Sequence, residues 1–170
     1  RARAGQKYED ILAFYYKDTA LYTVGTYDTA PRITAEGCTF QSCGISGIKP
    51  GTTTEKLLGK LQSDGVLSII DKKGAKKEGT LCTGDSVRNT YDNGLAIFDL
   101  PIVIYGDVDG NGKIDKDDIA ALQKHLIRSS ILGGPYLIAA DVNHDETVDI
   151  MDMIRLIQYV SDDAKITQED

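Results

Sequence analysis

The sequence contains little that would place it in a membrane or on a nucleic acid. None of its apolar runs approaches the roughly 18 consecutive residues that a membrane-spanning helix needs, so we expect no membrane insertion. Basic residues are outnumbered, with 19 Lys and Arg against 26 Asp and Glu, which argues against nucleic acid because phosphates require basic surfaces. No signal peptide is recognisable, and the chain begins with Arg1 rather than methionine, so we expect a fragment or a processed form.

Cysteine and histidine are scarce, and their arrangement indicates neither zinc nor a nucleophile. Cys38, Cys43 and Cys82 are an odd number of thiols, so either one disulfide forms and leaves a free thiol, or all three are buried and reduced. No CxxC motif or cluster of Cys and His indicates zinc. No Ser/His/Asp or Cys/His arrangement and no phosphate loop is recognisable either, so the sequence predicts a chain that is not an enzyme.

The last third of the sequence contains one acidic pattern twice. In segments 107–118 and 141–152, oxygen-bearing side chains occupy positions 1, 3, 5, 9 and 12, and the second segment starts 34 residues after the first (141 minus 107). Calcium takes six to eight oxygen ligands, and a twelve-residue loop with this spacing wraps one ion, with a backbone carbonyl from position 7. The pattern predicts one calcium ion per loop, held by Asp107, Asp109, Asn111, Lys113 (backbone), Asp115 and Asp118, and by Asp141, Asn143, Asp145, Thr147 (backbone), Asp149 and Asp152.

The two loops depart from the usual EF-hand pattern in different ways. Position 12 is Asp in both, so the last ligand is one methylene shorter than the usual Glu. Position 6 is Gly112 in the first loop but Glu146 in the second, where a positive φ is required. A side chain in that conformation costs about 1 kcal/mol. We therefore expect the second loop to bind calcium more weakly.

The segments that flank the loops are a strand and two helices. Residues 96–106 are rich in β-branched and aromatic side chains and contain Pro101, which favours a strand and leaves no room for an entering helix. After each loop, apolar residues recur at helical spacing. They are Ile119, Leu122 and Leu126 after the first loop, and Met153, Leu156 and Val160 after the second.

A calcium loop followed only by its exiting helix, repeated, with Asp at position 12 and a Gly-Asp-Val-Asp-Gly-Asn-Gly start, resembles a dockerin. Dockerins are small extracellular modules that attach proteins to cohesins on bacterial scaffoldins. The resemblance covers roughly residues 105–161. It implies two calcium ions, three helices with the middle one near residues 135–139, and a secreted, extracellular or cell-surface protein. It also implies a monomer that binds one cohesin through a helical face.

The repeats differ where the resemblance implies cohesin contacts, at positions 10 and 11 of each loop. These are Lys116 and Asp117 in the first repeat, and a hydrophobic pair in the second, which looks more like the class that anchors scaffoldins to the cell surface. We therefore expect a single binding orientation dominated by the last helix. The expected face consists of Ile150, Met151, Ile154, Arg155, Ile157 and Gln158, with smaller contributions from Lys116 and Asp117. The alternative is that Ile154 and Ile157 pack inside the molecule, on the middle domain or on the middle helix.

Residues 37–105 predict a small β-rich, sandwich-like domain. Thr39–Ile48 and Val66–Ile70 favour strands, and Thr52–Thr54 offers hydroxyl caps for a short helix through Leu61. The segment resembles the X modules that precede dockerins, on the strength of Gly-Ile-Lys-Pro-Gly-Thr-Thr and Thr83-Gly84-Asp85. Such modules are implied to brace the dockerin.

The first 28 residues include one amphipathic segment. Tyr8, Ile11, Leu12 and Tyr15 form an apolar helix face. This run resembles the tail of stage II sporulation protein D-like domains, which act on peptidoglycan. An ordinary amphipathic helix that docks on the middle domain is the alternative.

The sequence therefore predicts an α+β chain in which a β-rich module precedes an all-α, three-helix dockerin with two EF-hand-like calcium loops. The expected divisions are a helix and upstream tail at 1–28, a linker at 29–36, the β-rich domain at 37–105, the dockerin at 106–163 and a disordered tail at 164–170. The expected function is non-catalytic, calcium-dependent anchoring of a parent protein to a cohesin. A calcium sensor or buffer, and a fragment of a peptidoglycan-active enzyme, are the alternatives.

Overall fold

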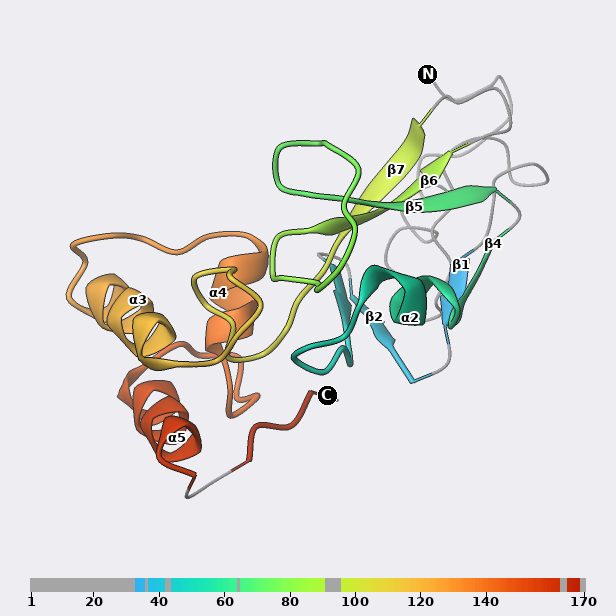
Figure 1. The fold of residues 1–170 in the computed structure, drawn as a ribbon. Coiled ribbons are helices and arrows are strands. Elements are labelled where there is room, and N and C mark those ends of the chain that lie inside the picture. The colour runs from blue at the N-terminus through green and yellow to red at the C-terminus, as the bar shows by residue number, and fades with distance from the viewer. Residues whose placement is uncertain are drawn as a thin grey trace, which may run out of the picture.

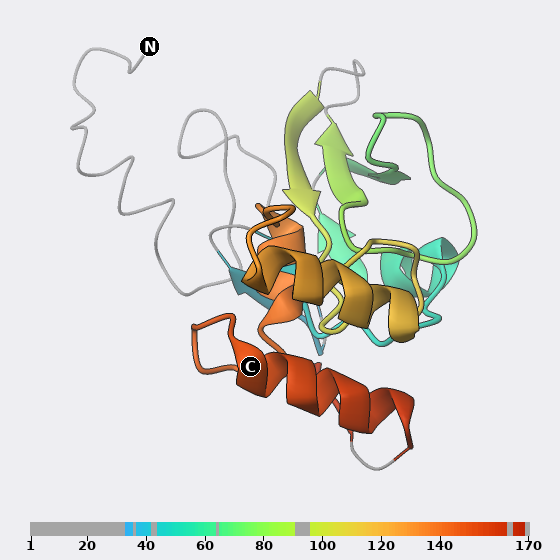
Figure 2. The same cartoon turned by 90° about the vertical axis from the view of Figure 1, so that its left-hand side faces the viewer.

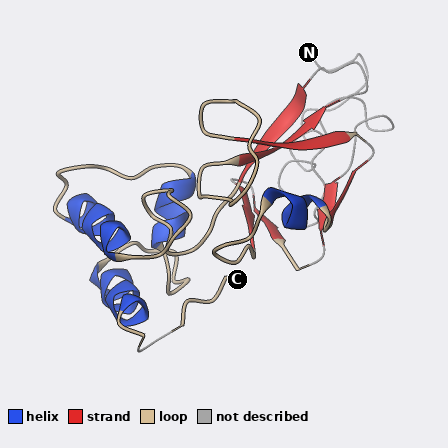
Figure 3. Cartoon of the chain, in the orientation of Figure 1, coloured by secondary structure: helices blue, strands red, loops and turns tan. Residues whose placement is uncertain are grey.

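The structure, a computed structural model, describes residues 33–35, 37–41, 44–63, 65–90, 96–162 and 165–168. Within these residues the chain is α+β, with a β-rich part followed by a helical part (Figures 1 and 3). The predicted N-terminal helix and its sporulation-protein-like tail at 1–28 lie outside the described residues. None of the described helices is long and apolar enough to cross a membrane.

Among its described residues, the β-rich part contains three small antiparallel sheets and one short helix. Two sheets are pairs of three-residue strands, and the third has the order β5-β6-β7. The pairs are β1 (Ile33–Ala35) with β4 (Leu61–Ser63) and β2 (Thr39–Gln41) with β3 (Gly44–Ser46). The larger sheet consists of β5 (Val66–Ile70), β6 (Ser86–Thr90) and β7 (Ala96–Pro101), and helix α2 spans Thr54–Leu58.

The predicted linker at 29–36 differs from the structure at its C-terminal end. Ile33–Ala35 form strand β1, and the side chain of Ile33 is fully buried in the core of the β-rich part. A buried isoleucine contributes about 1.5–3 kcal/mol to folding, which explains why this segment joins the domain rather than staying a spacer. Helix α2 begins as predicted, because the Thr53 hydroxyl accepts a hydrogen bond from Lys56 N at 3.4 Å.

The helical part contains α3 (Lys116–Leu126), α4 (Pro135–Ala140) and α5 (Ile150–Val160), and α3 packs against α5 (Figure 2). Helices α3 and α5 begin with the same capping box, because Asp115 and Asp149 cap them while Asp118 and Asp152 bond back to the cap amides. Helix α4 begins at Pro135, as the sequence predicts, since proline's missing N–H is harmless in the first turn.

The segment that joins the two parts belongs to both cores. Ile102 and Ile104 are buried in the core of the β-rich part, whereas Val103 and Tyr105 are buried in the core of the helical part. Successive side chains of an extended chain point to opposite sides, so four consecutive residues serve two cores. The junction is therefore an integral piece of both domains, and no entering helix precedes the first loop.

The predicted disordered tail at 164–170 also differs from the structure, at residues 165–168. Ile166 is buried in the core of the helical part, and Gln168 forms hydrogen bonds with both backbone groups of Tyr105. These two hydrogen bonds and the burial of Ile166 hold the tail against the helical part. Of the cysteines, Cys38 and Cys82 are free, and Cys43 lies outside the described residues.

Candidate metal centre

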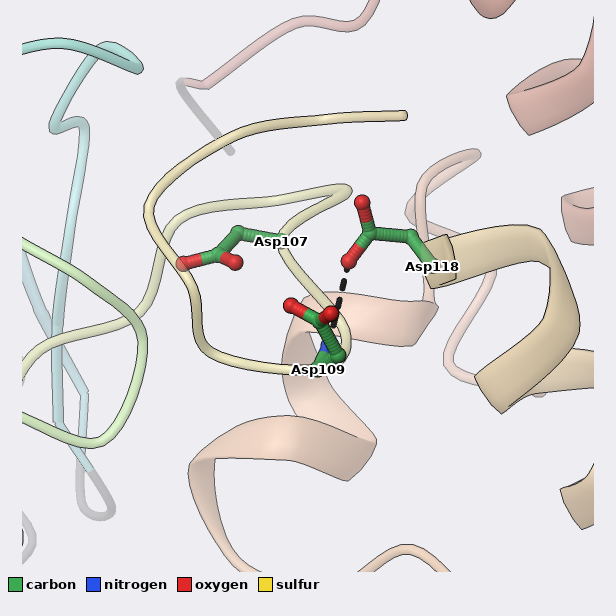
Figure 4. Close-up of side chains that lie close together, drawn as sticks. All are labelled: Asp107, Asp109 and Asp118. Atoms are coloured by element: carbon green, nitrogen blue, oxygen red, sulfur yellow. Dashed lines mark hydrogen bonds between the residues drawn. The ribbon is translucent and has the colours of Figure 1, made fainter. Parts of the chain in front are cut away.

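Three carboxylates of the first loop meet at one point (Figure 4). One oxygen from each of Asp107, Asp109 and Asp118 lies within 4.8 Å of the others. Asp107 and Asp118 are fully buried, and Asp109 is partly exposed. The positions at the start and the end of the predicted loop are therefore brought together, as a site that encloses a cation requires.

Backbone amides hold these carboxylates in place. Asp118 Oδ1 accepts hydrogen bonds from Val108 N at 2.7 Å and from Asp109 N at 3.0 Å, the latter drawn in Figure 4. Asp107 Oδ1 accepts one from Gly112 N at 3.0 Å. The last residue of the loop, Asp118, is therefore hydrogen-bonded to the second and third residues. The sixth residue, Gly112, is hydrogen-bonded to the first, Asp107.

The other predicted positions of the first loop have local roles in the structure. Asp115 lies outside the three-carboxylate group, and its Oδ1 accepts a hydrogen bond from Asp117 N at 2.8 Å. The Asn111 side chain bonds to Asp109 Oδ2 and to Lys113 N, at 2.8 Å in each case. The Lys113 side chain is exposed, which agrees with a role for its backbone alone.

The second loop repeats this hydrogen-bond network. Asp152 accepts from Asn143 N at 3.2 Å and from Asp149 N at 2.9 Å, and Asp141 Oδ2 accepts from Glu146 N at 2.9 Å. Over the described residues, however, a group of three carboxylates within 4.8 Å occurs in the first loop alone. Asp141 is partly exposed and Glu146 is exposed, whereas Asp107 and Gly112 at the same positions of the first loop are buried, so the second loop is the more open of the two.

The predicted backbone strain at Glu146 is confirmed. Its φ is +66°, and Gly112 at the same position of the first loop has a φ of +84°. Within the second loop, His144 also has a positive φ, +61°, where the first loop has Gly110 at +73°. This conformation was not predicted from the sequence. The His144 ring packs edge-on against Tyr105 at 4.3 Å, and its Nε2 lies 3.1 Å from the Thr167 carbonyl oxygen. These contacts help to offset the strain.

Burial disfavours the ionised form of the buried carboxyl groups at position 1 of the first loop and position 12 of both loops when no cation is bound. Desolvation raises the pKa of Asp118 to about 6, against the hydrogen bonds that it accepts from backbone amides. It also raises the pKa values of Asp107 and Asp152. Oxygen-only donors, crowded and buried, fit a hard divalent cation such as calcium, whose charge would compensate for the burial.

Two hydrogen bonds to the first loop come from the β-rich part, and sequence reasoning missed both. Thr83 N donates to Asp107 Oδ2 at 2.7 Å, and Lys72 Nζ donates to the Gly110 carbonyl at 3.2 Å. These partners lie 24 and 38 positions apart, so no local pattern could have indicated them. The one sequence signal near this contact was the Thr83-Gly84-Asp85 motif, which did not indicate its partner in the first loop.

The predicted partner face is exposed. The exposed fractions are 51% for Ile150, 54% for Met151, 42% for Ile154 and 41% for Ile157. The alternative that Ile154 and Ile157 pack inside the molecule is therefore wrong for this structure, and Leu156 fills the core instead. The polar members of the predicted face are also exposed, namely Arg155, Gln158, Lys116 and Asp117.

Comparison with known proteins identifies the helical part. The family model of the dockerin type I domain matches residues 105–166. A similar solved structure from Acetivibrio cellulolyticus is described as the third cohesin ScaC in complex with the ScaB dockerin, mutated in its N-terminal helix. The identity is 28%, the TM-score is 0.36, and the match covers 39% of this chain and 93% of that chain. No curated protein matches the sequence. The segment 105–166 of this chain is a dockerin type I domain.

Proposed function

We propose that this chain is a non-catalytic, calcium-dependent assembly module that anchors its parent protein to a cohesin outside the cell. In this proposal a β-rich, sandwich-like module braces a three-helix dockerin with two EF-hand-like loops, each of which binds one calcium ion. The dockerin match over residues 105–166 supports the class of partner. The observation that carries the proposal is the apolar stripe on α5, which directly follows the second loop.

The stripe has the properties of a docking surface. Ile150, Ile154 and Ile157 repeat at helical spacing, and Met151 lies beside them. All four are exposed, although side chains of this size are normally buried. Burying these side chains in a groove of a partner would be favourable, because it removes apolar surface from water.

The proposal also fixes one binding orientation. The positions of α3 that correspond to Ile150 and Met151 are Lys116 and Asp117, which are exposed and charged. A cohesin groove that accepts the apolar pair would have to bury two charges if the module were rotated to exchange its repeats. Unpaired buried charges are costly, so the α5 orientation should dominate.

A calcium sensor is disfavoured by what precedes the first loop. Sensor EF-hands expose a groove by moving two helices about each loop. Here β7 and the buried segment from Ile102 to Tyr105 lead into Asp107, so the first loop has a helix on one side alone.

A cohesin panel tests the function directly. The full chain should bind at least one purified cohesin in 1:1 ratio with calcium present, measured by titration calorimetry, and binding should disappear in excess chelator. Failure to bind any cohesin, while calcium itself binds, would contradict the anchoring role. Release of peptidoglycan fragments by the chain would contradict the non-catalytic assignment.

A further inference from the structure

A turn of the β-rich part is packed directly on the first loop. A Cβ built on Gly112 would lie 2.9 Å from the Leu81 carbonyl oxygen and 3.0 Å from Cys82 Sγ. A Cβ on Gly110 would lie 2.7 Å from the Thr83 carbonyl oxygen. The two surfaces are therefore in close backbone contact, and the first loop cannot change shape without disturbing this turn.

Thr83 is the centre of this contact. Its hydroxyl donates to the Ile104 carbonyl at 3.2 Å and accepts from Ile104 N at 3.1 Å. Its own N–H donates to Asp107 Oδ2 at 2.7 Å. Thr83, Ile104 and Asp107 are all fully buried. The side chain of Thr83 therefore fixes the backbone that holds the first predicted calcium ligand.

The second loop has no equivalent partner among the described residues. Asp141 accepts its hydrogen bonds from Asp145 N at 3.2 Å and Glu146 N at 2.9 Å, both inside the loop. Asp141 is also partly exposed, whereas Asp107 is fully buried. The hydrogen bonds given for Asp141 thus come from its own loop, whereas Asp107 is held both by its own loop, through Gly112 N, and by the β-rich part, through Thr83 N.

We propose that Thr83 is a positioning residue for calcium in the first loop, so that the β-rich module and this ion stabilise each other. The inference rests on the calcium binding proposed above. A carboxylate has about four lone-pair sites, so Asp107 can accept from Thr83 and Gly112 and still bind a cation. Partners that orient a metal-binding carboxylate contribute strongly to metal affinity. By linkage, calcium in the first loop then strengthens the β-rich module around Thr83.

Calcium titration of the full chain and of a Thr83→Val variant tests this positioning role. Valine keeps the shape of threonine but loses the hydroxyl that bonds to Ile104. We expect on the order of 10-fold weaker calcium binding at the first loop and unchanged binding at the second. Nuclear magnetic resonance of the Gly112 and Glu146 amides separates the two loops. A general destabilisation of the fold would weaken calcium binding at both loops, not at the first loop alone.

Two further variants serve as controls. Thr83→Ser retains the hydroxyl and should restore first-loop affinity. Thr90→Val removes another threonine hydroxyl, which donates to the Val66 carbonyl at 3.1 Å within the larger sheet, and should leave both loops unchanged. A folded Thr83→Val protein that binds calcium normally at both loops overturns the inference. If instead the unmodified chain binds no calcium, the proposed function itself fails.

Hydrogen exchange provides a second test that leaves Thr83 intact. Asp118→Asn and Asp152→Asn alter position 12 of the first and second loops, and neither residue contacts the turn at 81–85 in the hydrogen bonds described. With calcium present, Asp118→Asn should speed exchange of the Thr83 amide at least several-fold, while Asp152→Asn should not. Equal protection of this amide in both variants overturns the coupling.

Discussion

Gln168 forms two hydrogen bonds with the backbone of Tyr105, each 2.9 Å long. Its Nε2 donates to the Tyr105 carbonyl, and its Oε1 accepts from Tyr105 N. Gln168, in the segment after the last helix, therefore pairs with both backbone polar groups of Tyr105, which lies two residues before the first loop. With Ile166 buried alongside, the end of the domain is fastened to its beginning.

Gln168→Ala should destabilise the helical part by about 1–3 kcal/mol, because it removes two buried hydrogen bonds to the backbone of Tyr105. Denaturant unfolding with saturating calcium measures this change. Gln123→Ala, at an exposed site on α3, should have little effect. Equal stabilities for the two variants would contradict the role of the Gln168 pair.

Removal of calcium should unfold the helical part. The crowded carboxylates of Asp107, Asp109 and Asp118 then repel one another, and the small core is marginal alone. Circular dichroism in excess chelator should show loss of helix. Asp107→Ala should weaken calcium binding far more than Lys113→Ala, whose side chain points to solvent. Unchanged helicity in chelator would contradict this prediction.

The pH dependence of stability should reverse sign with calcium. The folded-state pKa of Asp118 is about 6, above the ordinary value of 3.8, so the contribution of this group to the stability of the calcium-free fold is fully present below about pH 4 and is lost as pH rises through 6. With calcium bound, the ionised form is the one required, and stability should rise over the same range. Circular dichroism of the calcium-free chain should show more helix at pH 4 than at pH 7, and denaturant unfolding with calcium at pH 5 and pH 7 checks the opposite direction. In Asp118→Asn the calcium-free dependence should become weaker.

Glu146→Gly should tighten calcium binding at the second loop by about fivefold, since it removes about 1 kcal/mol of strain at a φ of +66°. His144→Gly relieves a similar conformation but also removes the ring contact with Tyr105, so its gain should be smaller. Titration calorimetry compares the two. Weaker binding by Glu146→Gly than by the unmodified chain would refute the strain argument.

Met151→Asp should weaken cohesin binding by about 2 kcal/mol or more if Met151 is a buried anchor of the interface. Lys116→Ala and Asp117→Ala should each have a smaller effect, because charges at a rim contribute little. Calorimetry with one cohesin measures all three variants. If Met151→Asp leaves the cohesin affinity unchanged while Lys116→Ala or Asp117→Ala lowers it strongly, the module binds in the reverse orientation.

Several features were predictable from the sequence because they depend on local spacing. Loop positions 1 and 12 meet because twelve residues with this ligand pattern fold back on themselves, and Asp115 and Asp149 cap helices three residues before Asp118 and Asp152. Val66–Ile70 forms a strand as its β-branched composition indicates. The positive φ at Glu146 followed from the position alone.

The boundaries of the domains were less predictable, because burial rather than composition decides them. Ile33 belongs to the β-rich core although its neighbours resemble a linker, and Ile166 belongs to the helical core although it follows the last periodic helix. A single isoleucine in a polar segment carries no period, so its burial is decided by which surface happens to lie beside it.

By itself the sequence determined the two acidic loops, the helices that follow them and the apolar stripe on α5, since each depends on residues that are close together along the chain. Tertiary structure alone decided that Thr83 holds Asp107, that Gln168 holds Tyr105, and that residues 102–105 serve two cores. The first two contacts join residues 24 and 63 positions apart, whose proximity depends on the packing of whole domains rather than on any local pattern.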